Sequence, residues 1–133
     1  MLINEKVKLL SLDSHGNLVV LENEDNNLPF NIKRIFYIFG TNEEAIRGCH
    51  ANRNSKFLLI AVAGKVNVKV RTKEKEVVYE LNNPKEGLYL DRMVWKEMYK
   101  FSKDCVLLVI SNNKYEKGEY IDDYDQYLKE IYD

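Results

Sequence analysis

The chain has 133 residues, of which 45% are hydrophobic and 31% are charged, and its formal net charge is -1. A chain of this length holds one domain with a continuous apolar core, so we expect residues 1–133 to form a single domain. The balanced charge argues against a disordered or polybasic protein, and the scattered basic residues do not predict nucleic acid as a partner.

The first residues do not have the pattern of a signal peptide or a membrane segment. Charges within residues 5–8 interrupt the apolar region that a signal peptide requires. The longest apolar run, residues 57–63, falls well short of the roughly 20 residues that span a bilayer. These features predict a cytoplasmic protein without a membrane partner, in which Cys49 and Cys105 stay reduced rather than form a disulfide.

Short β-branched and aromatic runs recur along the chain, separated by turn residues, and they predict an antiparallel sandwich or barrel. The expected strands lie at residues 7–12, 17–22, 33–39, 57–64, 65–71, 76–81, 87–90 and 104–111. Residues 57–63 are apolar throughout, which predicts a strand covered on both faces. Val66, Val68 and Val70 alternate with polar residues, as in a strand that is solvated on one face.

Only the C-terminal segment, residues 119–133, shows helical periodicity. Apolar residues there follow i, i+3, i+7 and i+10 spacing: Ile121, Tyr124, Leu128 and Ile131. This stripe predicts one helix packed on the outside of the barrel. We expect its tyrosines, including Tyr120, to contribute packing rather than chemistry, because an amphipathic helix needs an apolar face in any case.

The segment IRGCHANR, residues 46–53, holds His50 and, two residues later, Asn52, at a spacing with which many β-barrel metal sites begin. Zinc or iron needs three or four ligands, yet His15 is the only other histidine and asparagine is a poor ligand for these metals. Two alternatives remain open. His50 is a half-buried histidine satisfied by hydrogen bonds, or it is an acid/base, because an imidazole exchanges protons near neutral pH.

Strand geometry predicts how this segment is oriented. Side chains two apart point to the same face, so His50 and Asn52 would share one face while Arg47 and Cys49 share the other. Cys49 would therefore not contact His50, and we expect it to pack rather than act as a nucleophile.

Five segments carry a resemblance to a known family. They are residues 27–40, 43–53, 86–98, 101–112 and 120–131. In this order, and at similar spacing, they resemble the cupin-fold dTDP-4-keto-6-deoxyglucose 3,4-ketoisomerases of bacterial sugar biosynthesis. The likeness spans nearly the whole chain.

The resemblance implies a fold, a reaction and partners. The fold would be an all-β, cupin-type jelly-roll barrel with one C-terminal helix, assembled as a homodimer with N-terminal strand exchange. The reaction would move a ketone from C4 to C3 of a dTDP-linked 4-keto-6-deoxy sugar through an enediol, by acid/base catalysis without a metal or an organic cofactor. The product would serve the biosynthesis of a 3-amino-3,6-dideoxy sugar.

The resemblance also implies catalytic residues. His50 matches the first histidine of the family's HxH pair and would carry the proton transfer. Asn52 matches the second histidine, and here the chain departs from the family, because a neutral amide binds an oxygen but cannot take up a proton. Tyr37 matches a tyrosine of the active-site strand. Either His50 suffices, with Tyr37 or solvent completing the shuttle, or the reaction differs.

Four further residues are expected to bind substrate. Arg34 and Arg47 are candidates for the diphosphate and sugar oxygens, because guanidinium groups bind phosphate bidentately. His15 and Lys96 lie where the chain differs from its relatives, and they would be proton donors near the sugar or plain loop residues. Two other functions stay open, namely a related dTDP-sugar epimerase or tautomerase, and a non-catalytic cupin that binds a nucleotide sugar.

Overall fold

The computed structural model describes residues 6–8, 10–12, 17–23 and 28–133. Two antiparallel five-stranded sheets make up its body. The first sheet has the order β1 (Lys6–Lys8), β9 (Glu86–Leu90), β6 (Phe57–Ala63), β11 (Val106–Ser111) and β4 (Arg34–Phe39). The second has the order β12 (Tyr120–Ile121), β5 (Arg47–Asn52), β10 (Trp95–Tyr99), β7 (Val66–Arg71) and β8 (Glu76–Leu81).

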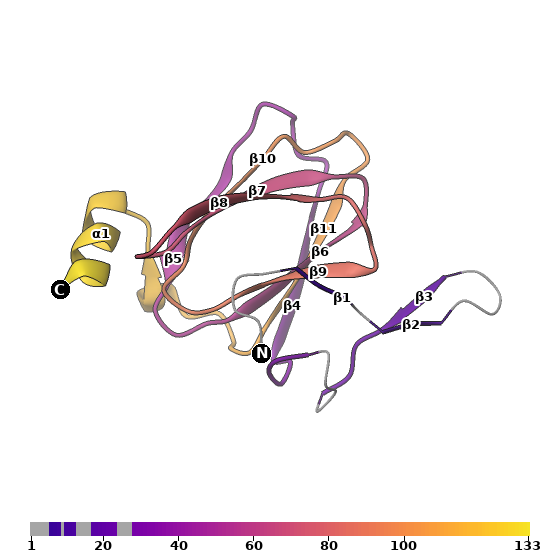
Figure 1. Cartoon of the computed structure of the whole chain (residues 1–133), viewed down its shortest axis with the longest axis horizontal. Coiled ribbons are helices and arrows are strands. Elements are labelled where there is room, and N and C mark those ends of the chain that lie inside the picture. Colours follow the sequence, from indigo (N-terminus) through magenta and orange to yellow (C-terminus); the bar gives the residue numbers. More distant parts are fainter. Residues whose placement is uncertain (1–5, 9, 13–16, 24–27) are drawn as a thin grey trace.

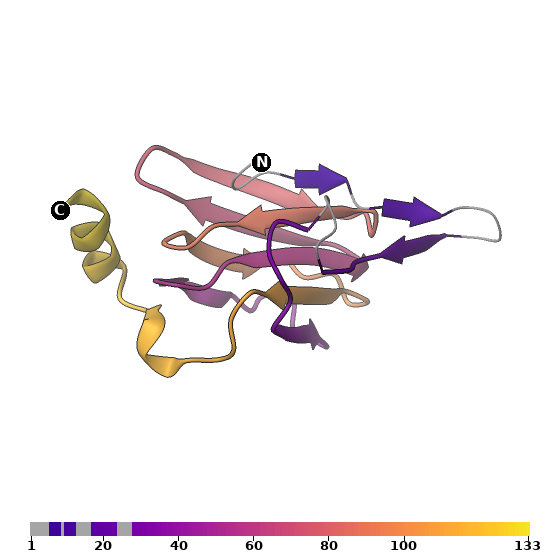
Figure 2. The same ribbon diagram turned by 90° about the horizontal axis from the view of Figure 1, so that it is seen from below.

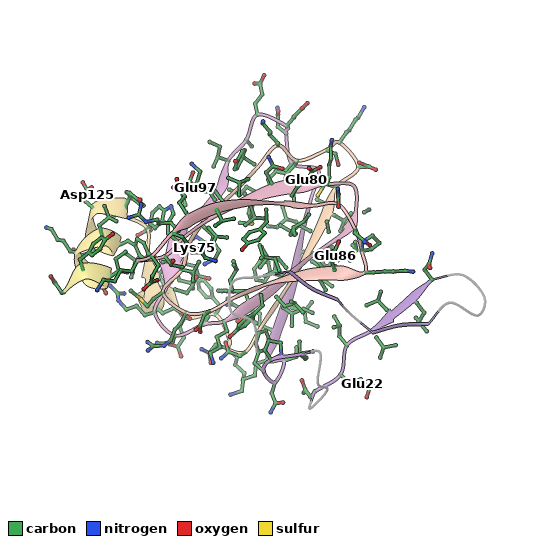
Figure 3. All side chains as sticks on the ribbon, viewed as in Figure 1. Glu22, Lys75, Glu80, Glu86, Glu97 and Asp125 are labelled. Carbon is green, nitrogen blue, oxygen red and sulfur yellow. The ribbon has the colours of Figure 1, made fainter. Side chains whose placement is uncertain are left out.

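The two sheets curve around a shared core and form a barrel (Figure 1). Leu59 and Leu107 from the first sheet join Val68 and Met98 from the second in one apolar cluster. Side chains fill the inside of the barrel, as the sticks in Figure 3 show. The all-β fold with one C-terminal helix is therefore confirmed.

The alternation patterns read from the sequence are also confirmed in the main. Strand β6 is buried from Phe57 to Ala61, although Val62 near its end is 43% exposed. In β7 the three valines are buried and the polar residues between them are only partly covered. Both cysteines are free thiols.

The predicted C-terminal helix is present but begins later than expected. Residues 117–119 form the short 3-10 helix η1 (Lys117–Glu119), and Tyr120 and Ile121 form strand β12, which pairs with β5. Helix α1 (Tyr124–Tyr132) starts after Asp123, whose carboxylate accepts hydrogen bonds from the backbone N–H groups of Asp125 and Gln126. The expectation that Tyr120 and Ile121 are helical was wrong, because Asp123 caps the helix and β12 completes a sheet.

A hairpin of β2 (Leu10–Leu12) and β3 (Leu18–Val20) projects from the barrel, and α1 lies at the opposite end in both views (Figures 1 and 2). The segment after this hairpin covers the outer face of the first sheet, where Leu28 and Phe30 pack near Ile60 and Tyr89. None of the helices in the described part of the chain is long and apolar enough to cross a membrane.

Candidate active site

A pocket of about 160 Å³ lies between the two sheets inside the barrel. Most of its wall is apolar, with Phe36, Phe57 and Val109 among the lining side chains. Its polar side chains come from strands of the second sheet: Arg47, His50, Lys96 and Tyr120. A mostly apolar pocket with a few polar groups is the usual form of a small-molecule site.

A β-bulge in β5 shapes this pocket. Lys96 on β10 pairs with His50, whereas the next residue, Glu97, pairs with Gly48, so that Cys49 is an extra residue in the ladder. Gly48 and Cys49 both have positive φ, at 82° and 58°. The bulge breaks the strand alternation, and Arg47 and His50 both line the pocket. The prediction that Arg47 and His50 lie on opposite faces was therefore wrong, while Cys49 packs against the cluster under α1.

His50 is held as a neutral imidazole. Burial lowers its pKa to about 4, and the positive charge of Lys96 acts in the same direction. The Gly48 backbone, Asp122 and Glu119 oppose this shift without cancelling it. At neutral pH His50 is therefore unprotonated, which is the form that a general base requires.

Lys96 lies next to His50 on the neighbouring strand. Its side chain is buried, its Nζ donates a hydrogen bond of 3.1 Å to Oδ1 of Asn52, and it lies 4.8 Å from the centroid of the Phe57 ring. Burial lowers the pKa of Lys96 to about 7; Glu119 works against this shift and Arg34 adds to it. An amine with such a pKa exchanges protons at neutral pH, which an ordinary lysine does not.

Asn52 lies behind Lys96 and does not line the pocket. It is only 1% exposed, and its Nδ2 has no hydrogen-bond partner of good geometry among the described residues. The Asn52 side chain nevertheless acts on the nearby Glu119 and helps to lower its pKa. The orientation of the amide follows from Lys96, which needs an acceptor, and only Oδ1 is one.

Glu119 is the buried carboxylate of this region. It accepts hydrogen bonds from the backbone N–H groups of Asn54 and Ser55, at 3.2 and 2.8 Å, and from the Ser55 hydroxyl. Burial acts to raise the pKa of Glu119, but these hydrogen bonds lower it and prevail. Glu119 is thus an ionised carboxylate whose oxygens already accept hydrogen bonds from Asn54 and Ser55. It makes no ion pair with Lys96 in the described part of the chain.

The two arginines differ in setting. The guanidinium of Arg34 lies 5.5 to 5.9 Å from the ring centroids of Phe36, Phe57 and Tyr115, and its Nε and Nη2 are buried without a hydrogen-bond partner in the described residues. Unpaired buried donors of this kind are costly and suit an anionic ligand. Arg47 is exposed at the edge of the pocket.

The structure brings most of the predicted site residues together. His50, Lys96 and Arg47 line the pocket, Asn52 is bonded to Lys96, and the charge of Arg34 acts on Lys96.

The other two predicted site residues are Tyr37 and His15, of which the structure describes only Tyr37. Tyr37 points away: it is 62% exposed and its ring lies 5.9 Å from that of Phe39, while its neighbours Phe36 and Ile38 line the pocket. His15 lies outside the described residues.

The sequence interpretation missed two residues of the site. Tyr120 was expected to serve packing in the helix, yet it lines the pocket with its ring centroid 4.8 Å from that of His50. Glu119 was not singled out at all. The dipeptide Asp122–Asp123, a candidate helix cap, is the signal that would have removed both residues from the helix.

Within the ranges that the structure describes, no group of three or more His, Cys, Asp or Glu side chains is arranged to hold a metal ion. The polar groups of the pocket are instead an imidazole, an amine, a guanidinium and a phenol. The fold and this set of groups define a small cupin-type barrel equipped for proton transfer on a bound small molecule.

Comparison with known proteins assigns the family. The family model described as "FdtA: WxcM-like, C-terminal" matches residues 4–132, and the chain belongs to this family. A TDP-4-oxo-6-deoxy-alpha-D-glucose-3,4-oxoisomerase of Aneurinibacillus thermoaerophilus is 39% identical over 122 residues, which cover 90% of this chain and 86% of the relative. The resemblance read from the sequence is thereby confirmed.

Solved structures of related enzymes have the same fold. WlaRA, a TDP-fucose-3,4-ketoisomerase of Campylobacter jejuni, is 41% identical with a TM-score of 0.90, covering 96% of this chain and 94% of that one. A histidine-to-asparagine variant of the 3,4-ketoisomerase QdtA of Thermoanaerobacterium thermosaccharolyticum, in complex with TDP-4-keto-6-deoxyglucose, is 34% identical with a TM-score of 0.91. The alignment covers 98% of this chain and 96% of the QdtA chain.

Proposed function

We propose that this protein is a sugar-nucleotide 3,4-ketoisomerase that converts a TDP-linked 4-keto-6-deoxyglucose to its 3-keto isomer. The observation that carries the proposal is the neutral, partly buried His50 facing the same pocket as Lys96. Family membership, and relatives named as TDP-sugar 3,4-ketoisomerases and oxoisomerases, support the same reaction.

The chemistry needs a base beside a polarised ketone. The proton at C3 is acidic because it lies next to the C4 carbonyl, and neutral His50 is the base that removes it. A cation that stabilises the resulting oxyanion lowers the barrier, and Lys96 is the cation next to His50 in this pocket. The enediol that forms takes up a proton at C4 and gives up the proton on O3, which yields the 3-ketone.

Two arginines are the proposed substrate-binding groups. We propose that Arg34, through Nε and Nη2, and Arg47, at the pocket edge, bind oxygens of the diphosphate and the sugar. Tyr120 is better placed than Tyr37 to contact the sugar, since only Tyr120 lines the pocket. His15 and the cytoplasmic location remain predictions from the sequence.

A homodimer is the proposed assembly. The outer face of the edge strand β4 carries Ile35, Tyr37 and Phe39, which are 57%, 62% and 68% exposed. An exposed apolar edge strand is a pairing site, and a second copy of the chain would cover it. The projecting hairpin of β2 and β3 (Figure 2) is the segment that we propose the two copies exchange.

Light scattering tests the assembly. A particle of twice the 15.7 kDa chain mass is expected, and Tyr37→Glu together with Phe39→Glu should shift it to the monomer. A wild-type monomer at micromolar concentration would refute the dimer.

One assay tests the activity. The protein is incubated with TDP-4-keto-6-deoxyglucose in deuterated water, and the sugar is followed by NMR. We expect a 3-keto product with deuterium at the exchanged carbon, the loss of both in His50→Ala, and the retention of both in Cys49→Ala. Binding without exchange or conversion in the wild type would refute the isomerase and favour a nucleotide-sugar-binding cupin, while inversion without ketone transfer would favour an epimerase.

A further inference from the structure

Lys96 and Asn52 form a buried pair next to His50. Lys96 is 4% exposed and Asn52 is 1% exposed, and the amine donates a 3.1 Å hydrogen bond to the amide oxygen. Strand pairing sets Lys96 directly opposite His50, so the amine and the imidazole line the same pocket from adjacent strands.

Among the residues that the structure describes, no carboxylate forms an ion pair with the Lys96 amine. Glu119 of η1 attracts the amine, but its carboxylate accepts hydrogen bonds from Asn54 and Ser55 instead. Arg34 of β4 repels the amine. Burial is the main cause of the lowered pKa of His50 on β5, and the charge of Lys96 adds to it. A buried lysine with an amide, an aromatic ring and two basic neighbours is unfavourable for folding, which indicates a functional reason for keeping it.

We propose that Lys96 is the second acid/base of the reaction, serving the sugar oxygens while His50 serves the carbons, and that Asn52 positions it. The inference rests on the proposed ketoisomerase activity. It accounts for the departure at Asn52, where the resemblance places a second histidine: the second proton carrier would instead be Lys96 of β10, which pairs with His50.

The steps balance without a further reactant. His50 takes the C3 proton while the Lys96 ammonium gives a proton to O4, which yields the neutral enediol, an imidazolium and a free amine. The amine then takes the O3 proton as the C3 ketone forms, and the imidazolium returns a proton to C4. Both groups end in their starting protonation states.

Asn52 suits the positioning role because its Oδ1 accepts a hydrogen bond from an amine in either protonation state. It therefore holds Lys96 in place throughout the cycle without taking a proton itself. The lowered pKa of Lys96, about 7, agrees with this role, since both of its forms are populated near neutral pH.

The first test separates charge from proton transfer. Lys96→Arg keeps a cation but cannot release a proton, because a guanidinium group stays protonated in proteins. We expect KM to change only a few-fold and deuterium still to enter at C3, while kcat for ketone transfer falls about 100-fold or more. Lys96→Met, which lacks the cation, should lose both exchange and transfer, and the exposed Lys75→Arg (Lys75 is labelled in Figure 3) should lose neither.

The second test restores the family's second histidine at position 52. Asn52→His together with Lys96→Arg restores a two-histidine pair, and we expect it to recover at least a tenth of the wild-type kcat. A residue that only supports the fold would show no such rescue. The kcat/KM of the wild type should form a bell with limbs near pH 4 and 7, from His50 and Lys96, and the upper limb should vanish in Lys96→Arg.

Three outcomes would overturn the inference while leaving the ketoisomerase intact. They are unchanged kcat in Lys96→Arg, no rescue by Asn52→His, and a sugar adduct on Lys96 after borohydride reduction, which would indicate a covalent imine instead. A wild type that neither exchanges nor converts the sugar would instead refute the proposed function, so the two failures are distinguishable.

Discussion

The rings of His50 and Tyr120 lie with their centroids 4.8 Å apart and their planes tilted by 50°. The contact forms because β12 pairs with β5 at the edge of the second sheet, where Tyr120 lies opposite Asn52. It brings the C-terminal part of the chain next to His50. The wall of the pocket is therefore completed by a two-residue strand that precedes α1.

Replacing each of the two candidate tyrosines by phenylalanine tests which of them contacts the substrate. Tyr120→Phe removes a hydroxyl from the pocket, whereas Tyr37→Phe removes one from the outer face of β4. If the Tyr120 hydroxyl binds a sugar oxygen, its loss should raise KM or lower kcat by about 10-fold, corresponding to one hydrogen bond, and Tyr37→Phe should leave both near wild type. The reverse ranking in steady-state kinetics would return Tyr37 to the active site.

The bulge in β5 depends on Gly48. A Cβ at this position would lie 2.9 Å from the Lys96 carbonyl oxygen and 3.0 Å from Cε of Met98, and φ is +82°. We expect Gly48→Ala to reduce the free energy of unfolding by about 1–3 kcal/mol in urea titrations and to lower kcat, because His50 follows the bulge. Gly118→Ala is the control, since a Cβ there meets nothing within 4 Å; equal stability of the two variants would contradict the strain argument.

Replacing the buried amine should stabilise the fold while it abolishes activity. The pKa of Lys96 is about 7 in the folded protein against an ordinary 10.5, so the protein bears the full cost of the buried charge below pH 7. We expect Lys96→Met to raise the unfolding free energy at pH 6 by on the order of 2 kcal/mol, after the loss of its bond to Asn52.

The difference in unfolding free energy between Lys96→Met and the wild type should depend on pH. Between pH 7 and 10.5 the unfolded chain binds the lysine proton and the folded protein does not, so wild-type stability rises with pH relative to Lys96→Met. The advantage of the variant should therefore shrink across this range in urea titrations. Exposed Lys75→Met should show no such trend, and a pH-independent gap for Lys96→Met would contradict the lowered pKa.

Glu119 should be a structural carboxylate. Glu119→Ala leaves the N–H groups of Asn54 and Ser55 without an acceptor, and we expect a loss of about 2–4 kcal/mol in urea unfolding. Because its folded pKa lies below the ordinary 4.5, its contribution is present above pH 4.5 and is lost as the pH falls through the folded value. Glu119→Gln, which keeps an acceptor, should lose less; equal losses would show that the hydrogen bonds contribute little.

Local patterns made most of the strands predictable. Val66, Val68 and Val70 alternate with polar residues, and the alternation depends on the strand itself. Strand β4 shows the limit of this approach. Ile35 and Tyr37 are as apolar as Phe36 and Ile38, so the sequence does not reveal which set faces the pocket.

The site was predictable to the extent that it lies on one strand. His50 was identified from its own segment, but the pairing of Lys96 with His50 and the extra residue at Cys49 depend on the register between β5 and β10, which no short window contains. Gly48 within a strand pattern was a signal for the bulge, because an isolated glycine there often marks one.

The gathering of Arg34, Arg47 and Lys96 around one pocket has a consequence for capture of the substrate. The chain as a whole carries a net charge of only -1, so its distant field gives an anionic nucleotide sugar little attraction. Near the pocket the charges of Arg34, Arg47 and the protonated form of Lys96 act together, and low-dielectric walls concentrate their field at the opening. Capture is therefore a short-range event, and the association rate should fall steeply with ionic strength once the Debye length shrinks below about 10 Å.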